Sequence, residues 1–261
     1  MVGNGAGGAD EPGVALVTGA ARRIGRAIAL DLAKQGYAVA VHYCASAGEA
    51  AETVASITAT GGRAVALDAD LASEDATSSL VARAAKALGP VRLLVNNAAI
   101  FEYDRPESAD ATSWQRHMAI NLRAPLVLTQ ALLAQLPRDA TANVVNLIDQ
   151  RVLNLTPHYT SYTISKAGLW ALTQHLAKAL APRIRVNAIG PGTVLPHAGM
   201  DDAEFTALCR AMPLGRGPTP EEICNALRFI LETPTITGQM ITIDAGQHLG
   251  WLLPGQTTRA P

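Results

Sequence analysis

The sequence is poor in charged, aromatic and cysteine residues. Of its 261 residues, 16% are charged, 4% are aromatic and three are cysteines, and the formal net charge is −1. A chain without excess charge has no basic field that attracts nucleic acid or anionic lipid. Three scattered cysteines form neither a disulfide framework nor a metal-ligand pattern, and no apolar run approaches the roughly 18 residues that span a bilayer. We therefore expect a cytoplasmic protein with no metal, nucleic-acid or membrane partner.

The N-terminal stretch MVGNGAGGADEPG lacks the basic region and the apolar core of a secretory signal. We expect residues 1–12 to form a flexible leader. No linker or repeat divides the rest of the chain, which is 49% apolar overall and long enough to bury one large core. Residues 13–261 are therefore expected to form one domain.

Short apolar runs alternate with stretches of helical periodicity along the chain. The β-branched run VALVTG (14–19) indicates a buried strand, and RIGRAIALDLAKQG (23–36) has apolar residues at helical spacing. This alternation predicts an α/β fold with right-handed crossovers, in which helices cover both faces of a doubly wound, seven-stranded parallel sheet. The other strands are expected over 37–43, 63–71, 91–99, 142–149, 183–192 and 239–246. The other helices are expected over about 47–62, 73–89, 110–135 and 160–181.

One segment interrupts this alternation. Residues 191–220 form a long insertion between the last two expected strands, with proline at both ends. Ligands of open parallel sheets bind outside the carboxyl ends of the strands, where this insertion would lie, so we expect it to be a substrate lid. The tail DAGQHLGW (244–251) is expected to reach this lid or a neighbouring subunit, with His248 and Trp251 packing rather than reacting.

A glycine-containing turn, TGAARRIG (18–25), connects the first expected strand to its helix. Gly19 allows a tight turn, and Gly25 allows the helix to pack closely on the strand. The first turn of the helix then presents backbone N–H groups to a phosphate. An ordinary strand–helix turn is the alternative, but the position between strand and helix is the context that a dinucleotide-binding motif requires.

The end of the second expected strand favours NADPH over NADH. An NAD site places an acidic residue there to bind the ribose hydroxyls, whereas this chain has His42, Tyr43 and Ser46 and no carboxylate. Together with Arg22, these residues favour a 2′-phosphate. The alternative for the arginines of this turn is a solvated surface charge.

Polar residues also follow the third and fourth expected strands. Asp70 is expected either to accept a hydrogen bond from the adenine amino group or to be a turn residue. The side-chain amides of NNAA (96–99) are expected to hold the backbone of neighbouring strands and to line the ribose.

Tyr162 and Lys166 are four residues apart at the start of an expected helix, so they share one helix face. A lysine beside a phenol would lower the pKa of the tyrosine and make it a usable proton donor near neutral pH. Tyr159 has a threonine four residues on and is the weaker candidate. The spacing alone is more often an ordinary helix surface, but together with the phosphate turn it indicates a catalytic pair.

The sequence resembles the short-chain dehydrogenase/reductase family over about residues 13–250, through TGAARRIG, DADL, NNAA, INLRAP, YTISK and GPG, in that order. The resemblance implies a single-domain Rossmann fold, NAD(P)-dependent hydride transfer and a homotetramer. It also implies that Lys166 binds the nicotinamide ribose and that Asn121 supports a proton-relay water. The cofactor is expected against Gly19, Arg22, Arg23, Ile24, Gly25, His42, Tyr43, Ser46, Asp70, Leu71, Asn97, Ala98, Tyr162, Lys166, Pro191 and Gly192.

Two residues depart from the usual pattern of this family. Arg23 stands where most members have glycine, and Asp149 stands where most have a serine that donates a hydrogen bond to a substrate carbonyl oxygen. An ionised carboxylate cannot donate, so Asp149 is badly suited to ketone reduction. It suits a substrate that is rich in N–H donors or is protonated on nitrogen, and a desolvated Asp149 could itself keep and deliver a proton.

Both departures occur in the pteridine reductases and the related dihydromonapterin or dihydrofolate reductases, which this sequence resembles. By that resemblance Arg23 reaches both the cofactor and the pterin, and Asp149, Tyr162 and Lys166 form the catalytic set. Phe101 is expected to stack on the pterin ring; its alternative is an ordinary core or lid aromatic.

The sequence therefore predicts an NADPH-dependent reductase of a pteridine C=N bond, with Arg23, Phe101, Asp149 and Tyr162 against the substrate. The first alternative is an NADPH-dependent carbonyl or 3-oxoacyl reductase of the short-chain family. The second is a non-catalytic NADP-binding regulatory protein, against which the intact catalytic residues argue.

Overall fold

The computed structural model describes residues 13–197 and 199–250 of the chain. The expected leader and Trp251 lie outside the described residues. Seven parallel strands form one sheet in the order β3-β2-β1-β4-β5-β6-β7, which confirms the doubly wound parallel α/β fold. The strands are β1 (Val14–Val17), β2 (Ala38–Tyr43), β3 (Ala64–Asp68), β4 (Val91–Asn96), β5 (Ala142–Leu147), β6 (Ile184–Pro191) and β7 (Met240–Ile243).

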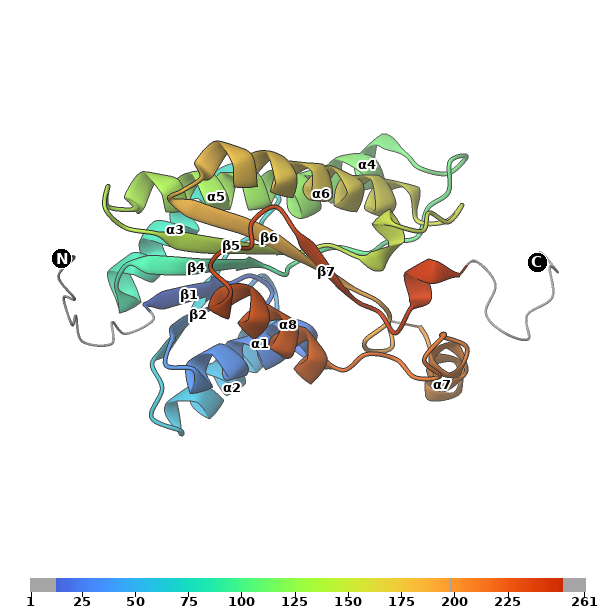
Figure 1. Cartoon of the computed structure of the whole chain (residues 1–261), viewed down its shortest axis with the longest axis horizontal. Helices are drawn as coiled ribbons and strands as arrows, with labels where there is room; N and C mark the ends of the chain where they lie inside the picture. Colours follow the sequence, from blue (N-terminus) through green and yellow to red (C-terminus); the bar gives the residue numbers. More distant parts are fainter. Residues whose placement is uncertain (1–12, 198, 251–261) are drawn as a thin grey trace, which may run out of the picture.

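Helices cover both faces of the sheet (Figure 1). One face carries α3 (Glu74–Leu88), α5 (Ala124–Gln135) and α6 (Thr160–Leu180), and the other carries α1 (Arg23–Lys34), α2 (Ala47–Thr58) and α8 (Pro220–Glu232). The shorter helices α4 (Ala111–His117) and α7 (Asp202–Arg210) lie toward the end of the molecule where the strands finish. Among the described residues, no helix is long and apolar enough to cross a membrane.

The sheet separates two apolar core layers because successive side chains of a strand point to opposite faces. In β1, the buried Leu16 packs in the layer that contains Leu132 of α5, whereas its neighbour Val17 packs in the layer that contains Ile28 of α1. A parallel strand covered on both faces is apolar along its whole length. This explains why VALV in β1 shows no polar alternation and is buried throughout.

Several strands end earlier than the sequence predicts. β1 ends at Val17 rather than Gly19, β3 at Asp68 rather than Leu71, and β7 at Ile243 rather than Gly246. Each of the three leftover segments contains glycine or aspartate, which favour turns because glycine adopts left-handed backbone and aspartate bonds to nearby N–H groups. These turns form the edge of the sheet where the site lies.

The helix expected over 110–135 changes pitch along its length. α4 passes into a π-helical turn, η1 (Met118–Arg123), which continues into α5. Single π turns inside longer helices occur frequently at functional sites. This one contains Asn121, whose side chain is fully buried.

The packing of β4 gives a stability prediction. Leu94 is fully buried in the layer beneath α3 and α5, so Leu94→Ala removes apolar contacts and leaves a cavity. We expect the free energy of unfolding to fall by about 2–5 kcal/mol in urea titrations. The matched control is Leu249→Ala, because Leu249 is 76% exposed and should change stability by less than about 0.5 kcal/mol. Equal effects of the two substitutions would contradict the assigned core.

Candidate active site

The turn between β1 and α1 brings backbone into very close contact. Gly19 has a φ of 61°, and a Cβ on Gly25 would lie 2.2 Å from the carbonyl oxygen of Gly19. The side-chain amide of Asn97 donates to the carbonyls of Thr18 (2.8 Å) and Gly19 (3.1 Å). The prediction that the amides after β4 hold a neighbouring strand end is therefore confirmed. Within the described residues no side-chain hydrogen bond caps the N-terminus of α1, which suits a phosphate of a dinucleotide.

The His42 side chain is buried and hydrogen-bonded to this turn, so it does not face a phosphate. Its Nδ1 accepts a hydrogen bond from the Gly19 N–H (3.0 Å), which requires the tautomer whose Nε2–H donates to the Ala69 carbonyl (3.1 Å). The ring is 2% exposed, and burial lowers the pKa of His42. The expectation that His42 is a base for the 2′-phosphate is wrong, because the packing of the turn leaves it buried and neutral.

The other polar residues expected near the cofactor lie at the carboxyl ends of β1, β2 and β3. Arg22 is exposed beside the N-terminus of α1, and Tyr43 ends β2. Ser46 precedes α2 without capping it, so its hydroxyl is not used by that helix. Asp70 is exposed and accepts a hydrogen bond from the Ala72 N–H (2.9 Å), which makes it a turn residue with one carboxylate oxygen left over. Their contacts to NADPH stay predictions.

The remaining expected cofactor residues line the same edge of the sheet. Leu71 is buried after β3, Ile24 is half-buried at the start of α1, and Ala98 follows β4 with its N–H bonded to the Thr18 hydroxyl (3.0 Å). Pro191 ends β6 and Gly192 follows it, where a Cβ on Gly192 would lie 2.7 Å from the Cβ of Asp244. The close packing of backbone around Gly192 suits the binding of a dinucleotide at this edge.

Arg23 has an unusual backbone conformation and a defined side-chain contact. Its φ is 56°, in the left-handed region that favours glycine, which explains the glycine usual at this position. Its guanidinium donates to the carbonyls of Pro196 (2.9 Å) and Leu195 (3.4 Å). The side chain thus connects the phosphate turn to the segment after β6.

Asp149 and Tyr162 form the centre of the site. The Tyr162 hydroxyl donates to Oδ2 of Asp149 (2.8 Å), and Oδ1 of Asp149 accepts from the Arg151 N–H (2.7 Å). Lys166 Nζ donates to the Leu147 carbonyl (2.7 Å) and lies 5.8 Å from the centre of the Tyr162 ring. Tyr162 and Lys166 are both buried. The structure thus brings together the three residues that the sequence proposed as a set.

The pKa of Tyr162 is raised, opposite to the expected direction. Burial has the largest effect, followed by the negative charge of Asp149 and its hydrogen bond to the phenol. Burial also lowers the pKa of Lys166 to about 8, although the charge of Asp149 raises it. The expectation that Lys166 lowers the tyrosine pKa is wrong, because Asp149 touches the phenol and the lysine does not. Tyr162 is therefore a neutral donor.

Asn121, in the π-helical turn between α4 and α5, bonds to the loop after β4 and to α6. Its side-chain amide donates to the Ile100 carbonyl (3.0 Å) and to the Ser165 hydroxyl (3.0 Å), and its oxygen accepts from the Ile100 N–H (2.9 Å). Both amide N–H groups are therefore bound to protein atoms. Its part in a proton relay stays a prediction.

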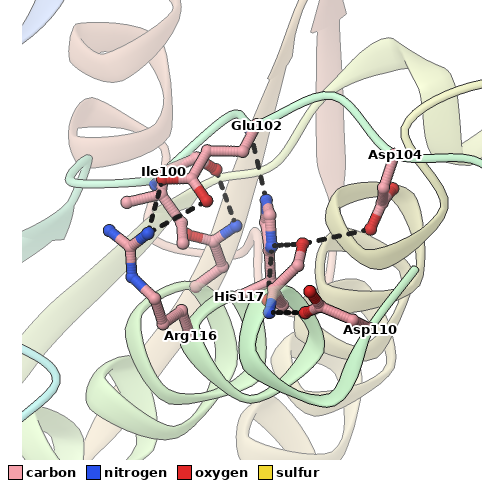
Figure 2. A network of polar contacts seen from close by, with 8 residues as sticks. Ile100, Glu102, Asp104, Asp110, Arg116 and His117 are labelled. Atoms are coloured by element: carbon pink, nitrogen blue, oxygen red, sulfur yellow. Dashed lines mark hydrogen bonds and ion pairs between the residues drawn. The ribbon is translucent and has the colours of Figure 1, made fainter. Parts of the chain in front are cut away.

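The loop that carries Phe101 is fixed on both sides of this residue. Ile100 is bonded to Asn121, and the Glu102 N–H donates to Nε2 of the buried His117 (3.3 Å). Figure 2 shows this network, in which Arg116 also pairs with Glu102 (2.8 Å). The backbone around Phe101 is thus held between two anchors.

Asp104 connects the same loop to the start of α6. This 3% exposed carboxylate accepts from the Ser161 N–H (3.1 Å) and from the Ser113 hydroxyl (3.2 Å). Its backbone carbonyl accepts from the Tyr159 N–H (2.8 Å). The residue therefore fixes the turn that begins the helix of Tyr162 and Lys166.

An aromatic cluster surrounds Phe101, in a chain with few aromatic residues. The Phe101 ring stacks on the Tyr159 ring with centroids 4.2 Å apart. It also makes a T-shaped contact with the Tyr162 ring, with centroids 4.7 Å apart. Tyr103 contacts Tyr159 at 5.1 Å and His158 at 6.0 Å. From the sequence, Tyr159 is expected only as the weaker catalytic candidate, and no role is predicted for Tyr103 or Arg151. The scarcity of aromatics elsewhere was the signal that could have found the cluster.

The C-terminal tail packs on the 191–220 segment of its own chain. Gly246 approaches Pro213, with 3.0 Å between a Cβ on the glycine and the Cβ of the proline. The Thr193 N–H donates to the side-chain oxygen of Gln247 (3.1 Å). His248 bonds Asp244 through Nδ1 (2.7 Å), as expected of a residue with a structural role.

A family model described as Enoyl-(Acyl carrier protein) reductase matches residues 19–248. The 3-oxoacyl-[acyl-carrier-protein] reductase of a Synechocystis species is 32% identical over 89% of this chain and 96% of its own. The chain belongs to the short-chain dehydrogenase/reductase family. Another similar relative is the 3-oxoacyl-[acyl-carrier-protein] reductase FabG of Staphylococcus aureus, which is 33% identical over 90% of this chain and 98% of its own.

Solved structures of short-chain dehydrogenases/reductases have the same fold. The FolM alternative dihydrofolate reductase 1 of Brucella suis, crystallised in complex with NADP, is 45% identical with a TM-score of 0.89, covering 92% of this chain and 97% of its own. A short-chain dehydrogenase/reductase of Serratia marcescens is 32% identical with a TM-score of 0.84, covering 90% and 97%.

The backbone of Arg23 gives a test within this short-chain dehydrogenase/reductase. Arg23→Gly and Arg23→Ala both remove the two hydrogen bonds to residues 195 and 196, but only glycine adopts a positive φ without strain. We expect the glycine variant to be more stable than the alanine variant by about 1 kcal/mol in urea unfolding. Equal stabilities would contradict the left-handed conformation.

The charge of Asp149 gives a test of the site electrostatics. A nearby negative charge stabilises the ammonium form, so Asp149→Asn should lower the pKa of Lys166 from its value of about 8. NMR titration of the lysine Cε resonances measures this shift. Asp139→Asn, an exposed site before β5, is the control. An unchanged or raised lysine pKa in the Asp149 variant would refute the coupling.

Proposed function

We propose that the protein reduces a pteridine C=N bond and converts a dihydropterin, dihydromonapterin or dihydrofolate to its tetrahydro form. The coarser activity is that of an NADP-dependent oxidoreductase of the short-chain family, since the site has the family's tyrosine and lysine and similar proteins are crystallised with NADP. The observation that carries the finer proposal is the 2.8 Å hydrogen bond between the Tyr162 hydroxyl and Asp149.

A carboxylate at this position selects the chemistry of the substrate. An ionised carboxylate accepts hydrogen bonds and repels the negative oxygen that forms when a ketone is reduced. A pterin instead presents N–H and NH₂ donors along one ring edge, which a carboxylate can accept. Asp149 would therefore orient a pterin ring and disfavour a simple carbonyl substrate.

The proton in this reaction comes from Tyr162. When bound, NADPH supplies a hydride to a ring carbon of the C=N bond. The adjacent nitrogen then requires a proton, and Tyr162 is a neutral phenol because burial and Asp149 raise its pKa. Lys166, held by the Leu147 carbonyl (2.7 Å), places a cation beside the tyrosinate that remains after transfer.

The ring contacts fit a flat heterocycle. Phe101 is 39% exposed although its backbone is fixed on both sides, so it offers a stacking surface at a defined place. Arg23 bonds the phosphate turn to residues 195 and 196, next to His197, whose ring lies 6.1 Å from that of Phe101. We assign Arg23 a contact to the cofactor phosphate or the pterin edge, and we assign segment 191–220 the role of substrate lid.

The comparisons support two substrate classes. The Brucella relatives are named alternative dihydrofolate reductases and are 44–45% identical to this chain, whereas the 3-oxoacyl reductases are 32–33% identical. Reduction of a carbonyl or 3-oxoacyl group is therefore the second candidate, and Asp149 in place of a donor argues against it. The homotetramer implied by the family stays a prediction.

Replacing Asp149 tests the proposal directly. We expect Asp149→Ser to reduce kcat/KM for dihydromonapterin at least about 100-fold, because the ring loses its acceptor and Tyr162 its partner. The Kd for NADPH, measured by fluorescence, should change less than about threefold. Asp139→Ser is the control for a lost surface carboxylate. Equal losses of turnover and NADPH binding would mean that Asp149 has a structural role.

A further inference from the structure

The helix that carries Tyr162 and Lys166 begins without a cap of its own. The residue before α6, Tyr159, has a left-handed backbone (φ 61°, ψ 52°), and its side chain caps no backbone N–H. A capping side chain normally lies at this position and accepts from the N–H two or three residues on, as it does in α3, α4, α7 and α8. The first N–H groups of α6 therefore need an acceptor from elsewhere in the chain.

Asp104 supplies this acceptor from the loop that follows β4. Its carboxylate accepts from the Ser161 N–H (3.1 Å), in the first turn of α6, although the two residues are 57 positions apart. Ser161 is fully buried, so its N–H would lose its partner without gaining a solvent contact if the carboxylate were removed. Asp104 thus provides the N-cap that the local sequence of α6 lacks.

The carboxylate of Asp104 is a buried acid held by hydrogen bonds. Within residues 13–197 and 199–250 it takes part in no ion pair. Burial raises its pKa, but hydrogen bonds from Ser161 and Ser113 outweigh burial, and the pKa of Asp104 is lowered. The group is therefore ionised at neutral pH, and the dipole of α6 stabilises a negative charge at this end of the helix.

The same residue closes the loop that carries Phe101. Oδ2 of Asp104 accepts from the Ser113 hydroxyl of α4 (3.2 Å), and its backbone carbonyl accepts from the Tyr159 N–H (2.8 Å). Figure 2 shows Asp104 in the network that also fixes Glu102. The Phe101 ring, three residues before Asp104, stacks on the Tyr159 ring at 4.2 Å. Asp104 therefore connects the backbones of both stacked residues.

We propose that Asp104 is a positioning residue for the reduction: it holds the proton donor Tyr162 and the stacking ring of Phe101 at fixed places relative to each other. Tyr162 directly follows Ser161, and its hydroxyl meets Asp149 at 2.8 Å. Displacement of a reacting group by about 1 Å lowers a rate up to about 100-fold. The inference rests on the proposed function for its substrate, although Tyr162 would also be the donor to a carbonyl.

Replacing Asp104 should separate turnover from cofactor binding. In Asp104→Ala, kcat for dihydromonapterin should fall about 100-fold. The Kd for NADPH, measured by fluorescence, should change less than about threefold, because Asn97 and His42 hold the glycine turn. Asp104→Asn should restore most of the lost kcat, since asparagine caps helices about as well as aspartate. Its amide N–H can also donate to the Ser113 hydroxyl oxygen.

Asp110→Ala is the matched control. Asp110 is exposed and caps α4 by accepting from the Ser113 N–H (2.7 Å), so its loss removes a cap of the same chemistry but leaves α6 capped. Stability in urea should fall in both alanine variants, whereas kcat should fall only in Asp104→Ala. Equal kcat values in the two alanine variants, or no rescue by Asp104→Asn, would overturn the inference.

A milder variant keeps the test decisive if Asp104→Ala does not fold. Ser113→Ala removes the hydroxyl that donates to Oδ2 of Asp104, and kcat should fall about tenfold, the loss of one hydrogen bond to a charged group. The Kd for NADPH should again stay within about threefold. An unchanged kcat in Ser113→Ala would then contradict the positioning role.

Hydrogen exchange separates this inference from the proposed function, because it needs no substrate. In the same variants of the NADP-bound enzyme, amide exchange should rise in the first turn of α6 and in residues 100–104, and stay unchanged in β1. Unchanged exchange in both segments would refute the role of Asp104. Absence of turnover with every dihydropterin would instead refute the proposed function, and the kcat comparison would then use a β-keto ester.

Discussion

The hydrogen bond between Tyr162 and Asp149 is the interaction on which the chemistry of the site depends. It places a negative charge 2.8 Å from a buried phenol, and this charge adds to burial in raising the tyrosine pKa. The same charge supports a buried lysine that burial alone would neutralise more readily. A serine at this position would do neither. One substitution thus changes the electrostatics of the catalytic set and the kind of substrate edge that the site can accept.

The scaffold holds this pair by constraints that begin in the sheet. β5 delivers Asp149 and the Leu147 carbonyl to the same edge, and α6 presents Tyr162 and Lys166 one turn apart. Asp104 fixes the start of α6 through the Ser161 N–H. The rigid parts of the site are thus bonded to backbone, while the aromatic rings at its outer side remain partly exposed.

The fold could be predicted from the sequence because buried parallel strands leave a clear pattern of apolar runs between amphipathic helices. The trio Asp149, Tyr162 and Lys166 could also be proposed from spacing. The spacing of residues along the chain does not show, however, which side-chain atoms touch one another. From spacing, Lys166 is expected to lower the pKa of the phenol, whereas in the structure burial and Asp149 raise it. His42 is likewise expected to face a phosphate but is buried beneath the turn. The contacts of the Tyr159 ring with Phe101 and Arg151 were not predicted, because they depend on the left-handed backbone of Tyr159 before α6.

The measurement that tests the central claim most directly is NADPH oxidation at a wavelength of about 340 nm by the unmodified enzyme. Dihydromonapterin, dihydrobiopterin and a simple β-keto ester are offered in parallel at equal concentration. The account predicts turnover of a dihydropterin and little or none of the ester, because Asp149 accepts hydrogen bonds from ring nitrogens and repels a developing alkoxide. Steady turnover of the ester with no response to either pterin would contradict it, and would place the protein among the carbonyl reductases of its family.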